Sequence, residues 1–168
     1  DLFISSGMDE YAIEEFLERG GVGDGFGPGT ALTTSRDAPA LDVVYKLVAV
    51  ERDGEWRPSM KLSSGKATYP GPKRVGRVER DGEFVRDVIG RRDEDGPGRD
   101  LLVTVVDDGE VVSDCPPLDE VRETARRNVA ALPTGVRAIR DPATYEVAVS
   151  DDLAAETEAL RRRLESGS

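Results

Sequence analysis

The segment Leu2-Phe-Ile-Ser-Ser-Gly-Met-Asp9 places three apolar residues directly before a small polar turn. Such a run predicts a short buried strand that ends in a loop. A helix is expected from about Asp9 to Arg19, because apolar side chains recur there at helical spacing and Gly20-Gly21 follows. A second strand, Val22–Phe26, then leads into the loop Gly27–Thr30. This order predicts one βαβ-like unit of a parallel sheet or barrel.

Asp-Gly dipeptides mark the next part of the chain, residues 42–115, where the pattern changes to hairpins. Asp-Gly between two extended segments favours a tight β-turn. Three such hairpins in succession predict an antiparallel sheet. The turns are Arg52–Glu55, Arg80–Glu83 and Asp107–Glu110, and the flanking strands are expected at Leu41–Val50 with Ser59–Leu62, Val75–Glu79 with Phe84–Ile89, and Leu101–Val106 with Val111–Val112.

The last part, residues 116–168, is expected to be helical. One apolar face runs from Leu118 to Leu132 and stops at Pro133. Ser150 is a suitable N-cap for a final helix, which carries Leu153, Leu160 and Leu164. The fold class predicted from these patterns is α/β plus β, in three segments: 1–41, 42–115 and 116–168.

Composition excludes several kinds of function. The 168 residues include 34 Asp and Glu, 23 Lys and Arg, one Cys and no His, for a formal net charge of −11. A lone Cys115 forms no internal disulfide and no Cys-based zinc site, and without His neither a histidine base nor a haem ligand of that type is available. The charge argues against nucleic-acid binding, and no apolar run is long enough to cross a membrane. Nothing at the start resembles a signal peptide, so a cytoplasmic location is expected.

The basic residues are 19 Arg and only 4 Lys. An excess of carboxylates with few Lys is the pattern of proteins that live in high salt, where screening removes the self-repulsion of an acidic surface. We favour a halophilic source. An acidic protein from a high-GC genome would also prefer Arg and is the alternative.

A basic island runs from Trp56 to Val78, which contains six basic residues and no acid. We favour an anion site here over chance clustering on a solvated strand pair. The candidate side chains are Lys61, Lys66, Lys73 and Arg74.

Two glycine-containing loops are the candidate phosphate site. Glycine lets backbone N–H groups approach phosphate oxygens, and a threonine hydroxyl adds a donor. Asp9 suits contact with ribose hydroxyls or a metal-bound diphosphate, and equally suits the start of a helix. The loop residues are Ser6 and Gly7 after the first strand, and Gly27, Gly29 and Thr30 after the second.

Four stretches together resemble the nicotinate phosphoribosyltransferase family, in the right order and as far as about Pro142. They are Phe3–Glu10, Phe26–Thr30, Val44–Leu47 and Met60–Lys73. The resemblance implies the last βα units of a type II phosphoribosyltransferase α/β barrel, followed by an antiparallel β-rich domain and C-terminal helices. It also implies a cytoplasmic enzyme of pyridine nucleotide salvage and NAD biosynthesis. In that reaction nicotinate and phosphoribosyl diphosphate form nicotinate mononucleotide in a glycosyl transfer coupled to ATP, as in a ligase.

By the same resemblance, Gly27, Gly29 and Thr30 cradle the 5′-phosphate, and Ser6 and Gly7 lie at the diphosphate or phosphate end of the sugar site. The family loop often reads Gly-Val-Gly-Thr, and Pro28 here removes one backbone donor. Mg²⁺ would accompany phosphoribosyl diphosphate and ATP. The histidine that the family phosphorylates is absent, so no catalytic residue is assigned to this chain. The chain is expected to be the C-terminal part of a homodimeric enzyme, inactive alone, with its missing N-terminal part as a partner.

Two other readings stay open. One is a non-enzymatic module whose hairpins present a basic face to an acidic partner or to RNA, although only Tyr69 would be available there for base stacking. The other is a bare structural fragment.

Overall fold

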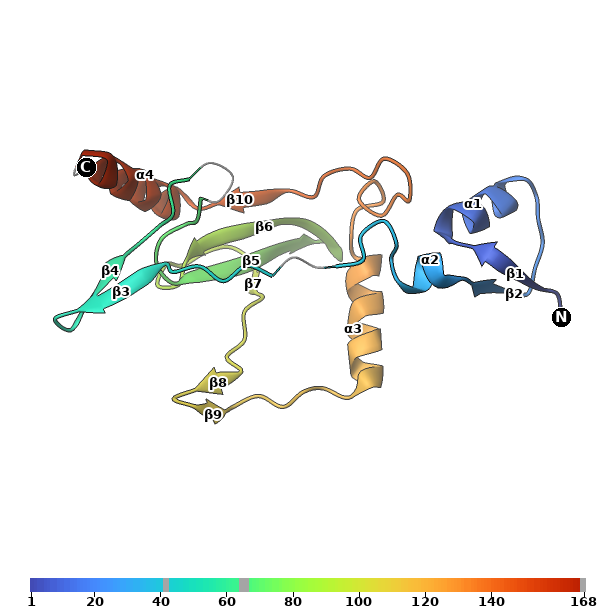
Figure 1. The fold of residues 1–168 in the computed structure, drawn as a ribbon, viewed down its shortest axis with the longest axis horizontal. Coiled ribbons are helices and arrows are strands. Elements are labelled where there is room, and N and C mark those ends of the chain that lie inside the picture. Colours follow the sequence, from blue (N-terminus) through green and yellow to red (C-terminus); the bar gives the residue numbers. More distant parts are fainter. Residues whose placement is uncertain (41–42, 64–66, 167–168) are drawn as a thin grey trace. The chain divides into compact units, whose positions relative to one another are not determined.

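The computed structural model describes residues 1–40, 43–63 and 67–166, which divide into two compact units (Figure 1). Unit 1 comprises Asp1–Tyr45 together with Ile139–Asp141, and unit 2 comprises Lys46–Ala138 together with Pro142–Ser168. The segment boundary expected between residues 41 and 42 lies outside the described residues.

Unit 1 is the βαβ arrangement that the sequence predicts. Strand β1 (Phe3–Met8) lies parallel to strand β2 (Gly25–Pro28), and helix α1 (Glu10–Glu18) connects them. A single helical turn, α2 (Thr30–Thr33), follows β2. Parallel strands need such a crossover, because a tight turn can join only antiparallel neighbours.

Helix α1 packs on the two strands through aromatic rings. Phe16 of α1 meets Phe26 of β2 edge to face, with ring centroids 5.8 Å apart. The expectation that the first strand is buried is wrong, because Leu2 and Phe3 are exposed. Phe3 is 69% exposed, so among the described residues little covers its side chain on this small sheet.

The three Asp-Gly turns form as predicted, each with both residues in the left-handed region. Aspartate φ values there lie between 47° and 57°, and glycine φ values between 78° and 83°. This backbone suits the twist of two-residue hairpins. The hairpins join β3 (Ala49–Arg52) to β4 (Glu55–Pro58), β5 (Lys73–Arg80) to β6 (Glu83–Arg91), and β8 (Val106–Asp107) to β9 (Glu110–Val111).

The hairpins do not share one antiparallel sheet, and that expectation is corrected. Of the three hairpins, only the β5–β6 hairpin belongs to the four-stranded sheet, whose strand order is β10-β6-β5-β7. Strand β7 (Arg99–Asp100) is antiparallel to β5, whereas β10 (Val147–Val149) is parallel to β6, so the sheet is mixed. Residues 41 and 42 of the first expected strand lie outside the described residues. Over residues 43–50, 59–62 and 101–106 the expected strands are shorter or displaced, because most of those residues have no partner strand in the described chain. Tyr45, for example, is 98% exposed.

Two helices complete unit 2. Helix α4 (Asp151–Ser166) begins as predicted at Ser150, whose hydroxyl accepts a hydrogen bond of 3.2 Å from the Leu153 N–H. Leu153 and Leu160 are buried, and α4 packs on β6. Helix α3 (Leu118–Ala130) also forms, but in the part of the chain that the structure describes it has no buried residue. Its predicted apolar face is therefore present and left uncovered.

An arginine and an aspartate form the centre of the four-stranded sheet. Arg77 of β5 faces Asp87 of β6 in the strand register and donates to both of its carboxylate oxygens, at 2.8 Å each. Tyr145 donates to the same carboxylate at 3.1 Å. The guanidinium lies 4.5 Å from the centroid of Phe84 and 5.9 Å from that of Tyr145. The positive charge of Arg77 is thus stabilised by one carboxylate and two aromatic rings.

Hydrogen bonds from Arg77 and Tyr145 hold the pKa of Asp87 below its usual value, although burial acts in the opposite direction. The pKa of Tyr145 is raised by burial and by its hydrogen bond to this carboxylate. The pKa of Asp87 is lower in the folded state than in the unfolded chain. The ion pair therefore stabilises the fold fully at pH values above the pKa that Asp87 has in the unfolded chain. That stabilisation is lost as the pH falls through the folded pKa.

We predict that Asp87→Asn lowers the free energy of unfolding by about 3 kcal/mol at neutral pH, since it leaves a largely buried guanidinium without its counter-charge. Urea unfolding measures this without adding salt. The difference between wild type and variant should shrink as the pH falls below about 4.

The matched control is Asp93→Asn. Asp93 also makes a two-bond ion pair, with Arg91 at 2.6 and 3.0 Å, but its side chain is 70% exposed. Exposed pairs contribute little to stability. Equal losses in the two variants would contradict a central role for Asp87.

Candidate phosphate site

The two glycine loops lie at the same edge of the β1–β2 pair. The register runs Phe3 with Gly25, Ile4 with Phe26 and Ser5 with Gly27, and resumes at Met8 with Pro28. Ser6 and Gly7 are therefore looped out of the ladder. Their φ values are +78° and +66°, so the chain turns through two left-handed residues as the strand ends.

A backbone hydrogen bond joins the loops. The Gly29 N–H donates to the Met8 carbonyl at 2.9 Å. Ser6 and Gly7 of β1 are thus brought close to Gly27 at the end of β2 and to Gly29 and Thr30 just after it, although about 20 residues separate the two loops in the sequence. Successive parallel strands place their carboxyl ends together, and phosphate sites in α/β folds commonly form there.

The two glycines of the second loop differ in the space around them. A Cβ at Gly27 would lie 3.2 Å from the Ser5 Cβ, which is tight, so packing against β1 favours glycine. A Cβ at Gly29 would meet nothing closer than the Met8 carbonyl oxygen at 3.9 Å. Gly29 also has φ −85° and ψ −170°, an extended conformation that any residue adopts. Packing in the described chain therefore does not require glycine at position 29.

Asp9 has the helix-start role that was one of its two readings. Its Oδ1 accepts a hydrogen bond of 2.9 Å from the Ala12 N–H and caps α1. Capping stabilises the helix and fixes the direction in which the chain leaves the first loop.

The candidate residues of the basic island lie in unit 2, and those described are engaged to different degrees. The Lys73 ammonium donates to the carbonyls of Tyr69 and Gly71, at 2.9 and 2.6 Å, and burial lowers its pKa. Arg74 lies 3.8 Å from the Asp100 carboxylate. Lys61 is exposed, and its side chain has no partner among the described residues, whereas Lys66 lies outside them.

Comparison with known proteins gives these loops a family context. Residues 98–156 match the family model described as nicotinate phosphoribosyltransferase C-terminal domain. Nicotinate phosphoribosyltransferase pncB2 of Mycobacterium tuberculosis is 42% identical over 163 residues, which is 96% of this chain and 34% of that protein. The chain belongs to the nicotinate phosphoribosyltransferase family.

Other members agree with this placement. The nicotinate phosphoribosyltransferase of Bacillus subtilis is 46% identical over 76 residues, covering 44% of this chain and 16% of that protein. The crystal structure of human nicotinic acid phosphoribosyltransferase superposes with a TM-score of 0.70 at 25% identity, over 94% of this chain and 32% of that one. The chain thus spans about a third of the length of the mycobacterial and human proteins.

Sequence reasoning missed one cation near the loops of this family member. Arg36 lines a small hollow of about 60 Å³ together with Asp9, Ala31 and Asp37. Its backbone N–H donates to the Ala31 carbonyl at 2.9 Å, which ties it to the turn after Thr30. Arg36 follows a run of threonines and a serine and has no spacing signal of its own, so only the folded structure reveals its position.

The many carboxylates of the described residues do not gather into a metal site. Within residues 1–40, 43–63 and 67–166, no three His, Cys, Asp or Glu side chains converge in a way that could hold a metal ion. The same residues include no helix that is both long enough and apolar enough to span a membrane.

Proposed function

We propose that this chain forms the C-terminal part of an enzyme that joins nicotinate to phosphoribosyl diphosphate in NAD salvage. The pyridine nitrogen forms a bond to C1 of the ribose and diphosphate leaves, which gives nicotinate mononucleotide. ATP hydrolysis to ADP and phosphate is coupled to this step. The observation that carries the proposal is the 42% identity to a nicotinate phosphoribosyltransferase, because it extends over 96% of the chain.

In this proposal unit 1 supplies the last βα units of a type II phosphoribosyltransferase barrel, and its loops bind the sugar phosphate. Gly27, Gly29 and Thr30 hold the 5′-phosphate, and Ser6 and Gly7 lie toward the diphosphate. The hydrogen bond between the loops supports this assignment, since it keeps both sets of backbone groups at one edge. Such loops accelerate the reaction by positioning and by fixed dipoles, not by a covalent step.

Mg²⁺ would neutralise phosphate charge when bound. It would arrive with the substrate diphosphate and with ATP, as the resemblance to the family implies. Of the candidate side chains of the basic island in unit 2, Lys73 already serves backbone carbonyls, whereas Lys61 has no side-chain partner among the described residues.

The complete enzyme is further proposed to be a homodimer in a salt-rich cytoplasm. The net charge of −11 and the scarcity of Lys support the second point.

We predict that Gly29→Val in the complete enzyme raises the KM for phosphoribosyl diphosphate at least about tenfold, because a branched Cβ obstructs the approach of phosphate to the backbone. The extended φ and ψ of Gly29 and the open space beside it allow the variant to fold. Steady-state kinetics with varied phosphoribosyl diphosphate provides the measurement. Gly135→Ala, far from the loops in sequence, is the control, and unchanged kinetics in a folded Gly29→Val would contradict the assignment.

The purified 168-residue chain alone is expected to make no nicotinate mononucleotide, even with ATP, Mg²⁺ and both substrates. It contains no His for a phosphohistidine step and spans only about a third of its relatives. Product formation is followed by chromatography, first with the chain alone and then after refolding with the remaining part of the protein. Turnover by the chain alone would show that the catalytic groups have been misplaced.

Salt should stabilise the protein. The melting temperature is expected to rise from dilute buffer to molar KCl, because screening relieves repulsion between exposed carboxylates. Scanning calorimetry over that range measures it. A flat response would argue for the high-GC explanation of the composition.

A further inference from the structure

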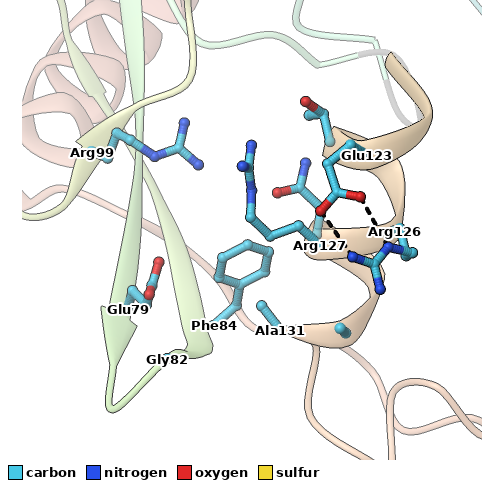
Figure 2. Close-up of a pocket in the computed structure, with 11 residues that line it drawn as sticks. Glu79, Gly82, Phe84, Arg99, Glu123, Arg126, Arg127 and Ala131 are labelled. Atoms are coloured by element: carbon cyan, nitrogen blue, oxygen red, sulfur yellow. Dashed lines mark hydrogen bonds and ion pairs between the residues drawn. The ribbon is translucent and has the colours of Figure 1, made fainter. Parts of the chain in front are cut away.

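A groove of about 690 Å³ lies in unit 2, between the turn of the β5–β6 hairpin and one face of α3 (Figure 2). Phe84, which is only 3% exposed, lies beneath it. None of the residues assigned above to phosphate binding lines this groove. Its residues 99 and 123–131 fall within the part of the chain that matches the C-terminal domain model.

Two arginines face each other across the groove. Figure 2 shows the guanidinium of Arg99, from β7, directed toward that of Arg127, which extends from α3 above Phe84. Among the described residues neither guanidinium has a carboxylate within 4 Å, and both side chains are exposed. Arg126, one position away, is different, because Glu123 accepts two hydrogen bonds of 3.0 Å from it.

The charge of the groove is opposite to that of the protein. Three arginines and two glutamates line it, so its net charge is +1, whereas the chain carries −11. Glu123 already pairs with Arg126. Glu79 is therefore the one remaining acidic residue of the groove lining to balance the charges of Arg99 and Arg127. Two like charges directed at one space repel each other, and an anion between them offsets that repulsion by attracting both. The planar donors of guanidinium match a phosphate or carboxylate in particular.

The walls of the groove are held at one end. The Phe84 N–H donates to the Ala131 carbonyl at 2.7 Å, which ties the end of α3 to the start of β6. The charge of Arg77, which lies against the Phe84 ring, is already neutralised by Asp87. This hydrogen bond and the pairing of β7 with β5 fix the backbone positions from which Arg127 and Arg99 extend, so binding would have to order only their side chains.

We propose that this groove is an oxyanion site, in which Arg99 and Arg127 together hold one phosphate or carboxylate group. The groove is large enough for an organic phosphate or carboxylate of metabolite size. An acidic side chain from another part of the complete protein would satisfy the same chemistry, and the experiment separates these two sources.

The experiment uses the complete protein. Crystals are soaked in tungstate, a phosphate analogue that is located by its anomalous scattering, so that this groove is distinguished from the glycine loops. Inorganic phosphate is then titrated calorimetrically into wild type, Arg99→Gln, Arg127→Gln and the double variant. Arg126→Gln is the matched control, because it removes the same charge from the same helix turn at a position that is already paired.

A free-ligand site predicts a tungstate peak between the two guanidinium groups and phosphate affinity at least about tenfold weaker in the double variant than in Arg126→Gln. An internal partner predicts no peak, a carboxylate within hydrogen-bond distance of both arginines, and a greater loss of melting temperature in Arg99→Gln than in Arg126→Gln. The proposal is overturned if neither tungstate nor a carboxylate lies between the arginines, or if Arg126→Gln weakens phosphate binding as much as the double variant.

Discussion

The contact between Arg77 and Asp87 is the interaction on which unit 2 depends most. Arg77 lies on β5, the strand that pairs with both β6 and β7, and Asp87 lies opposite it on β6. Tyr145 extends the contact toward β10. The described residues bury few apolar side chains, so this sheet has only a small hydrophobic core. The Asp87 carboxylate accepts two hydrogen bonds from Arg77 and one from Tyr145, and two aromatic rings lie against the Arg77 guanidinium. Removing any one of these partners would leave a polar or charged group uncompensated in a largely buried place, which is costly.

The basic residues of unit 2 are of two kinds: those whose charge has a partner within the fold, and those whose charge has none among the described residues. Within the acid-free stretch, Arg77 neutralises Asp87, Lys73 serves the carbonyls of a turn, and Arg74 lies near Asp100. The positive charges of these three residues therefore stabilise the fold. Among the described residues of unit 2, the arginines without a carboxylate partner include Arg99 and Arg127, which lie outside the stretch that is most basic in the sequence. Local charge density in a sequence therefore locates cations, but the folded partners decide which of them can meet a ligand.

The features that the sequence predicted correctly are local. The Asp-Gly turns depend on two adjacent residues that accept positive φ, and the cap at Ser150 depends on a side chain and the next turn. The membership of the sheet was not predictable in this way. Strand β10 has only three residues, and it pairs with β6, which lies more than 50 residues earlier in the sequence. No local pattern therefore predicts this strand. The burial of Phe3 was misjudged because it depends on what covers the sheet and not on β1 itself. Of the candidate site, the meeting of the two glycine loops followed from parallel order, whereas the position of Arg36 did not.

The bulge at Ser6 and Gly7 limits which mutations the protein can accumulate. At the φ of +78° found at Ser6, any residue with a Cβ has a steric clash that glycine avoids. Among residues with a side chain, asparagine and aspartate tolerate this conformation best. Position 6 can therefore drift among serine, glycine, asparagine and aspartate with small changes in stability, but valine, isoleucine and threonine are blocked by their branched Cβ. Neutral drift at the end of β1 is thus confined to residues that are small, and most of these are polar. The chemical character of the loop would be preserved by backbone geometry alone, even where selection for binding is weak.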